Sequence, residues 1–356
     1  MTTFKQLLVI GGLILCTVFS PTGATAKDNL VIGITQYPST FHPNIDSMLA
    51  KSYVHGLTRR PITVINAEWD TVCLLCEELP TLENGGAKLE KTPDGKDGIA
   101  VTYKIIDEAV WGDGNPITVD DVIFTWETGK HPKTGVSSTE GYRRILSIDR
   151  IDDKTFTLHV DRRTFDYNNL STMGLLPAHI ERSKFANPEA YKTQTAFDTD
   201  PMNPGLFMGP YVMTEAKTGS HMVFERNPKW WGKEPAFDKI TVRVIENTTT
   251  LEANLLSGGI DMISGELGLN VDQALAFEKR HGPKYTILFH PGLIYEHIDL
   301  MLDNPVLQDI RVRQALMYAI DRKAISERLF GGKQPVANTG INPLDWIYAD
   351  DVPRYV

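Results

Sequence analysis

Apolar residues recur along the chain with two periods, one typical of strands and one typical of helices. A short apolar run at residues 30–35 predicts a strand near the start of the chain. A period of two predicts three more, with the apolar positions Val101, Tyr103 and Ile105, then Phe156, Leu158 and Val160, and then Ile240, Val242 and Val244. Sheet strands are therefore expected along most of the chain.

Helical spacing is found between and after these strands. Thr118 and Asp121 have the separation of a capping box, and the apolar stripe that follows them predicts a helix. A second helix is expected at residues 251–257, ended by glycines, with residues 260–262 returning to the sheet. The clearest helical stripe consists of Val312, Ala315, Leu316, Ala319 and Ile320. Because helices and strands alternate, the pattern predicts an α/β or α+β class.

The first 26 residues have the features of a secretory signal peptide. Lys5 precedes an apolar stretch at residues 7–19, and Ala24-Thr25-Ala26 forms a cleavage site. The stretch is shorter than the roughly 20 residues that span a bilayer, which disfavours a retained anchor. Leu15 before Cys16 disfavours a lipoprotein. We expect cleavage after Ala26 and export of a soluble protein to the periplasm.

Composition and charge narrow the possible functions of the 356-residue chain. Its formal net charge of −9 argues against a nucleic-acid partner, because nucleic-acid binders normally carry a basic excess. The sequence motifs of zinc proteases, nucleotide-binding loops and serine hydrolases are absent, and the histidines lack ligand spacing. Asp120 and Asp121 are interpreted as structural rather than as an acid–base pair. We therefore predict no catalytic residue, no metal site and no cofactor.

Cys73 and Cys76 form the one compact reactive motif, a C-x-x-C. Such a motif is found in redox pairs, in half of a zinc site and in small structural disulfides. No second C-x-x-C completes a zinc site, and the neighbouring acids Asp70, Glu77 and Glu78 raise thiol pKa values. In an oxidising compartment we favour a structural disulfide.

Six segments, taken in order, carry a family resemblance. They are residues 111–122 (WGDGNPITVDDV), 151–155 (IDDKT), 209–211 (GPY), 227–231 (NPKWW), 256–261 (LSGGID) and 309–322 (DIRVRQALMYAIDR). In these segments the sequence resembles the periplasmic oligopeptide- and dipeptide-binding proteins of ABC importers, the extracellular solute-binding proteins of family 5. Each match is modest, but six in the family's order are specific.

The resemblance implies an α/β fold of two lobes, with ligand held between them and a subdomain inserted in the first lobe. We expect a first lobe formed by residues 27–68 and 207–290, an inserted subdomain at 69–206, and a second lobe starting at 291. Family chains extend well past this length, so the second lobe is expected to be incomplete at residue 356. A chain of this length is then expected to bind its solute weakly or not at all.

The implied function is that of the substrate-binding component of an ABC importer. It would capture peptides or similar small solutes, act as a monomer and deliver them to a permease in the inner membrane. Nickel chelates, haem and oligosaccharides are alternative ligands within the class. A secreted hydrolase and a sensor ectodomain are alternatives from other classes.

The candidate ligand-binding residues come from the resemblance alone. In relatives, the stretch before a [DH]-P pair contacts ligand, and here that pair is His42-Pro43. The matching residues are Gln36, Tyr37, Pro38 and Ser39. Pro38 lacks a backbone donor that an extended ligand could use, and a plain surface loop is the alternative interpretation. The acid that meets a peptide's amino group in relatives has no counterpart within these 356 residues.

Overall fold

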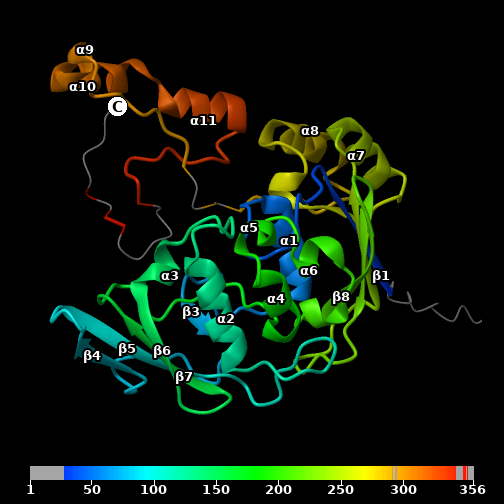
Figure 1. Cartoon of the computed structure of the whole chain (residues 1–356). Coiled ribbons are helices and arrows are strands. Elements are labelled where there is room, and N and C mark those ends of the chain that lie inside the picture. Colours follow the sequence, from blue (N-terminus) through cyan, green and yellow to red (C-terminus); the bar gives the residue numbers. More distant parts are fainter. Residues whose placement is uncertain (1–27, 291, 293–294, 342–347, 350, 352–356) are drawn as a thin grey trace, which may run out of the picture.

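The computed structural model describes residues 28–290, 292, 295–341, 348–349 and 351. The predicted signal peptide, residues 1–26, lies outside the described residues. Figure 1 shows a body of sheets with helices around them, and the helices of residues 305–330 grouped at one end. The α/β class predicted from the mixed periodicity is confirmed.

The larger sheet has five strands in the order β11-β1-β10-β9-β8. They are β1 (Asn29–Ile34), β8 (Tyr211–Lys217), β9 (His221–Arg226), β10 (Lys239–Val244) and β11 (Met262–Ile263). β1 runs parallel to both neighbours, with Ile32 opposite Val242 on one side and Met262 on the other. The strands predicted at residues 30–35 and 240–244, and the return to the sheet near residue 262, are confirmed.

The second sheet is antiparallel, in the order β4-β5-β7-β6. Its strands are β4 (Ala87–Lys91), β5 (Asp97–Lys104), β6 (Ile145–Arg150) and β7 (Thr155–Val160). Tyr103 and Phe156 lie opposite each other, and their rings stack with centroids 5.5 Å apart. The alternation of apolar residues predicted that both side chains face inward. Ile105 lies just outside β5, where it forms an isolated bridge with Cys76.

A two-stranded hairpin ends at the first cysteine of the C-x-x-C motif. It consists of β2 (Thr63–Ile65) and β3 (Thr71–Cys73). Cys73 and Cys76 are joined as a disulfide, with Cα atoms 5.2 Å apart. Cys76 is buried against the second sheet.

Helix α2 (Val119–Lys130) begins at the predicted capping box, which is confirmed. The Asp121 carboxylate accepts from the Thr118 amide at 2.9 Å and also reaches two other segments. It accepts from the Trp111 indole N–H at 3.2 Å and from the Ala178 amide at 2.8 Å. This structural role agrees with the interpretation of the Asp120-Asp121 pair.

The other helices of the body connect and cover the sheets (Figure 1). They are α1 (Leu49–Thr58), α3 (Glu140–Arg144), α4 (Ala178–Phe185), α5 (Pro188–Tyr191), α6 (Ala196–Thr199), α7 (Thr248–Leu256), α8 (Val271–His281), and the 3-10 turns η1 (Pro204–Leu206) and η2 (Gly265–Leu267). α7 confirms the helix predicted near residues 251–257, and Gly258 follows it with φ of 78°. A positive φ is the conformation for which glycine is favoured after a helix.

Apolar side chains form two buried clusters, one at each large sheet. The cluster at the four-stranded sheet includes Trp111 and Leu158. The cluster at the five-stranded sheet also includes Phe124, Leu176 and Phe197, which come from α2, from the segment before α4 and from α6. The chain between the two sheets therefore contributes to both cores.

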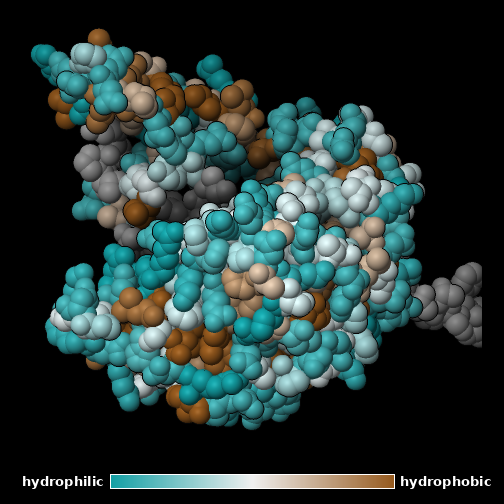
Figure 2. All heavy atoms as spheres, viewed as in Figure 1, coloured by the Kyte–Doolittle hydropathy of each residue, from teal (hydrophilic) through white to brown (hydrophobic). Residues whose placement is uncertain are grey.

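Helices α9 (Pro305–Gln308), α10 (Ile310–Ala319) and α11 (Arg322–Phe330) contain no buried residue. The helix predicted from the stripe at residues 312–320 is confirmed, although Ile320 lies just past its end. Apolar side chains including Ile310, Leu316 and Leu329 are exposed, and Figure 2 shows apolar atoms gathered on this part of the molecule. No helix among the described residues is long and apolar enough to cross a bilayer.

We predict that Asp121→Ala lowers the free energy of unfolding by about 2–4 kcal/mol, because two buried donors and the Thr118 amide lose their acceptor and α2 loses one half of its capping box. Urea unfolding of the purified protein measures this change. Asp120→Ala is the matched control. Asp120 is exposed and pairs with Arg150 at 3.1 Å, so its replacement should cost less than about 1 kcal/mol. Equal losses in the two variants would contradict the assigned role of Asp121.

Candidate ligand-binding site

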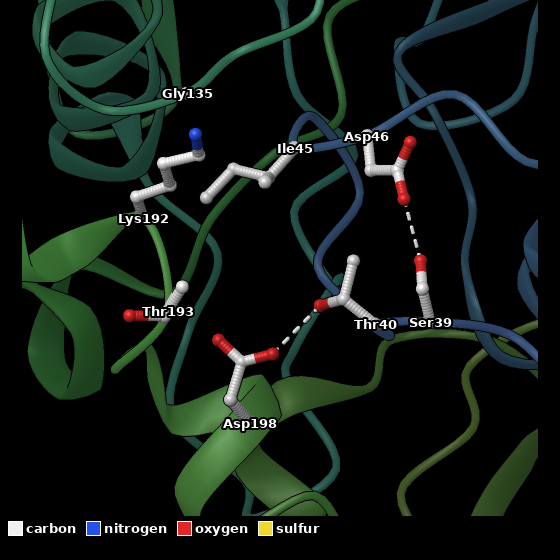
Figure 3. Close-up of a pocket in the computed structure, with 8 residues that line it drawn as sticks. All are labelled: Ser39, Thr40, Ile45, Asp46, Gly135, Lys192, Thr193 and Asp198. Carbon is white, nitrogen blue, oxygen red and sulfur yellow. Dashed lines mark hydrogen bonds between the residues drawn. The ribbon is translucent and has the colours of Figure 1, made fainter.

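The described residues contain a solvent-open hollow of about 520 Å³ beside the loop that follows β1. Three parts of the chain surround it: this loop, a turn after α2, and the chain from α5 to α6. The lining residues are Ser39, Thr40, Ile45, Asp46, Gly135, Lys192, Thr193 and Asp198 (Figure 3). The hollow is mostly lined by polar side chains, with Ile45 as the large apolar one.

Of the four residues predicted to contact ligand, Ser39 lines this hollow and the other three do not. Gln36 is exposed, Pro38 is buried, and Tyr37 is half-buried with its ring edge-on to Phe41, centroids 6.1 Å apart. Burial raises the pKa of Tyr37, and a hydrogen bond with Thr218 opposes that rise. The structure therefore brings only Ser39 together with the other lining residues.

A buried lysine holds the loop from inside. The Lys51 ammonium, on α1, donates to the carbonyl oxygens of His42 at 2.9 Å and Ile45 at 2.6 Å, and also to that of Asp46. These three bonds use all three ammonium protons. Asp46 has a left-handed backbone with φ of 58°, and its carboxylate accepts from the Ser39 hydroxyl at 2.5 Å.

The buried His42 ring fixes the same loop from the other side. Its Nδ1 accepts from the amides of Asn44 and Ile45, both at 3.1 Å, so the ring proton lies on Nε2, which donates to the Tyr191 hydroxyl at 3.3 Å. Asn44 pairs twice with Gly174, donating at 2.8 Å and accepting at 3.1 Å. The loop is thus joined to α5 and to the segment before α4.

The opposite wall of the hollow comes from α5 and α6. Asp198 closes the capping box of α6 with Thr195 and accepts from the Thr40 hydroxyl at 2.8 Å (Figure 3). The stem of Lys192 lies against Gly135, where a Cβ atom would come within 2.7 Å of it and where φ is 74°. Among the described residues, the Lys192 ammonium has no hydrogen-bond or ion-pair partner. It lines the same hollow as the carboxylates of Asp46 and Asp198, which already accept hydrogen bonds.

Positive charge is buried around His42. Besides Lys51, Arg59 is buried and donates to the carbonyl oxygens of Leu175 and Leu206. Burial, with the charges of Arg59 and Lys51, holds the pKa of His42 well below its ordinary 6.5. Burial and the charge of Arg59 lower the pKa of His55 to about 3, although His55 donates to the Phe41 carbonyl at 3.1 Å. Both histidines are therefore neutral near pH 7.

Most of the hollow was not predicted from the sequence. Three lining residues follow the predicted stretch 36–39 closely in the sequence, namely Thr40, Ile45 and Asp46. This closeness was the one sequence signal that they belong to the hollow. The Thr195-x-x-Asp198 spacing marks a cap, but it gives no hint that Asp198 meets Thr40. Lys51 sits in a helix where a lysine is normally exposed, so nothing in the pattern indicated its burial.

The profile of the bacterial extracellular solute-binding proteins, family 5 Middle, matches residues 87–356, well over half of the chain. The chain belongs to this family. The family consists of non-catalytic, extracellular or periplasmic solute-binding proteins, so the resemblance seen in the six segments is confirmed.

Relatives with known names or structures are similar over most of the described residues. The oligopeptide-binding protein AppA of Bacillus subtilis is 26% identical over 333 residues, covering 92% of this chain and 56% of AppA. The oligopeptide-binding protein of Thermus thermophilus, crystallised with a pentapeptide, is 27% identical with a TM-score of 0.73, covering 92% of this chain and 61% of that one. Heme-binding protein A of Haemophilus influenzae is 26% identical, covering 66% of this chain and 43% of that protein. The chain therefore spans less than two thirds of the length of each of these relatives.

We predict that acid destabilises the protein through its two buried neutral histidines. Below pH 6.5 the unfolded chain binds protons at His42 and His55 that the folded protein does not bind, so the free energy of unfolding falls as the pH falls. The slope is about 1.4 kcal/mol per pH unit for each histidine. Urea unfolding between pH 7 and pH 5 measures it. His55→Gln should flatten the slope, and an unchanged slope in that variant would contradict the prediction.

Proposed function

We propose that this chain is the substrate-binding component of an ABC importer and that it captures peptides or similar small solutes. The observation that carries the proposal is the match to the Thermus thermophilus oligopeptide-binding protein, which covers 92% of this chain and was solved with a pentapeptide. The family membership supports the same class of function. A permease in the inner membrane is the proposed partner, and the receptor acts as a monomer.

The loop of Gln36, Tyr37, Pro38 and Ser39, together with the hollow, is proposed as the part of the ligand site on the first lobe. Hydroxyl groups, carboxylates and the free Lys192 ammonium suit a ligand with polar and charged groups, such as a peptide. Haem requires a broad apolar surface, whereas Ile45 is the one large apolar side chain of this lining. Ligand would bridge two lobes and so favour their closed arrangement.

The proposed lobes keep the boundaries expected from the sequence. The first lobe comprises residues 27–68 and 207–290, with the subdomain of residues 69–206 inserted into it, and the second begins at residue 291. The separate apolar cluster at the four-stranded sheet supports a subdomain there. The side chains that α2 and α6 add to the other cluster indicate that this subdomain is packed against the first lobe rather than loosely attached.

The binding proposal is tested with the whole reading frame that encodes these residues, after denaturation and refolding to remove bound solutes. Calorimetric titration uses a pool of pentapeptides, the nickel chelate of histidine, and haem. We expect saturable binding of peptides with Kd on the order of 1 μM, and recovery of intact peptide. Lys192→Met should weaken peptide binding by about tenfold or more, since a charged donor is lost.

Lys88→Met is the matched control, because Lys88 is exposed on β4 away from the hollow and should leave Kd unchanged. Binding of the nickel chelate or of haem without peptide binding would overturn the proposed ligand class. Cleavage of the peptides would overturn the proposed function itself.

We propose that the protein is exported with loss of its leader and that the Cys73–Cys76 disulfide is present in the exported protein. Cleavage after Ala26 leaves Cys73 and Cys76 as the two cysteines of residues 27–356. We expect the intact mass of protein from the periplasm to lack residues 1–26 and thiol labelling of the unreduced, denatured protein to find no free thiol. Retention of the leader, lipid on Cys16, or two labelled thiols would each contradict this account.

A further inference from the structure

We propose that Lys51 is a positioning residue for the ligand site, because its ammonium sets the conformation of residues 42–46 and thereby directs the side chains that line the hollow. The inference rests on the proposed function in one respect, that the hollow is part of the ligand site. Its test needs no ligand, so its failure would leave the binding proposal standing.

All three acceptors of the Lys51 ammonium lie in the loop. They are the carbonyl oxygens of His42, Ile45 and Asp46, within ten residues before Lys51 in the sequence. Only 5% of Lys51 is exposed, so these carbonyls are turned inward and receive a charged donor in place of water. No carboxylate is hydrogen-bonded to the ammonium among the described residues, which distinguishes it from an ordinary buried ion pair.

The loop needs such a donor to keep its shape. Asp46 holds a left-handed backbone, which is unfavourable for residues other than glycine, although aspartate tolerates it better than most. Inward carbonyls without a donor carry a desolvation cost that favours turning them toward water. Loss of the ammonium therefore favours rotation of the peptide units at Ile45 and Asp46.

That rotation would reach the hollow directly. Ile45 and Asp46 both line it, and the Asp46 carboxylate accepts from the hydroxyl of Ser39, which lines it as well (Figure 3). The Ile45 amide also donates to His42 Nδ1. The Lys51 ammonium thus determines the direction of the Ile45 and Asp46 side chains and the hydrogen-bond acceptor of the Ser39 hydroxyl.

Hydrogen exchange tests this role in the whole chain, comparing Lys51→Met with the control Lys88→Met. Lys51→Met should speed exchange of the Asn44 and Ile45 amides by about tenfold or more, while the β10 amides change by less than about twofold. A uniform loss of protection in the loop and in β10 would show a general stabilising role and would overturn the proposal. Unchanged loop exchange would overturn it too.

A milder variant keeps the test decisive if Lys51→Met does not fold. Lys51→Gln retains two donors, and we expect its loop exchange to lie between that of the original protein and complete loss of protection, with β10 unaffected.

Nitrogen chemical shifts of the His42 ring provide a second readout. The proton should stay on Nε2 in the original protein and in Lys88→Met, and should distribute over both nitrogens in the Lys51 variants. A His42 ring unchanged in Lys51→Gln, together with unchanged loop exchange, would refute the positioning role.

Discussion

The pairing of β1 between β10 and β11 is the constraint on which the rest of the structure depends. The partners of Asn29–Ile34 lie more than 200 residues further along the chain, at Lys239–Val244 and Met262–Ile263. The chain from α1 to β9 is therefore held between two neighbouring strands of one sheet. The loop that leaves β1 enters this enclosed region at once, which is why residues 39–46 can meet α5 and α6 across the hollow.

Buried cations held by main-chain carbonyls are the second feature that shapes this region. Lys51 and Arg59 both donate to carbonyl oxygens rather than to carboxylates. Burial, together with their charge, lowers the pKa of His42 and keeps its ring neutral, and a neutral His42 can accept two loop amides at Nδ1. The acidic residues Asp46 and Asp198 lie at the surface of the same region and face the hollow. Two buried cations and a mixed lining of acidic and basic side chains therefore occur in the same region.

The elements that local patterns predicted are present, because each depends on neighbouring residues, but elements such as β8, β9 and α8 were not predicted. The alternation around Tyr103 and Phe156, the capping box at Thr118 and the stripe of α10 each report a burial period or a cap that forms within a few residues. The family resemblance was likewise seen in six short segments that occur in the family's order.

The candidate site depends on contacts that no local pattern contains. The hollow joins three distant parts of the chain, and of the four predicted residues only Ser39 lies in it. The burial of Lys51 follows from the path of the loop above α1, which is a tertiary property. Similarly, Phe124, Leu176 and Phe197 lie in a stretch predicted as one inserted unit, yet they pack into the core of the five-stranded sheet. Side-chain periodicity shows that such residues are buried, but it does not show against which sheet.

The most direct test of the account is to locate bound peptide relative to the hollow. A photo-crosslinking group attached at Ser39→Cys, in protein whose Cys73–Cys76 bond is intact, is irradiated with the pentapeptide pool, and the same group at Ile151→Cys serves as the reference. Ile151 is exposed in the turn between β6 and β7 of the four-stranded sheet. Peptide should be captured from position 39 and not from position 151, and excess unlabelled peptide should suppress the capture. Equal capture from both positions, or capture from position 151 alone, would contradict it.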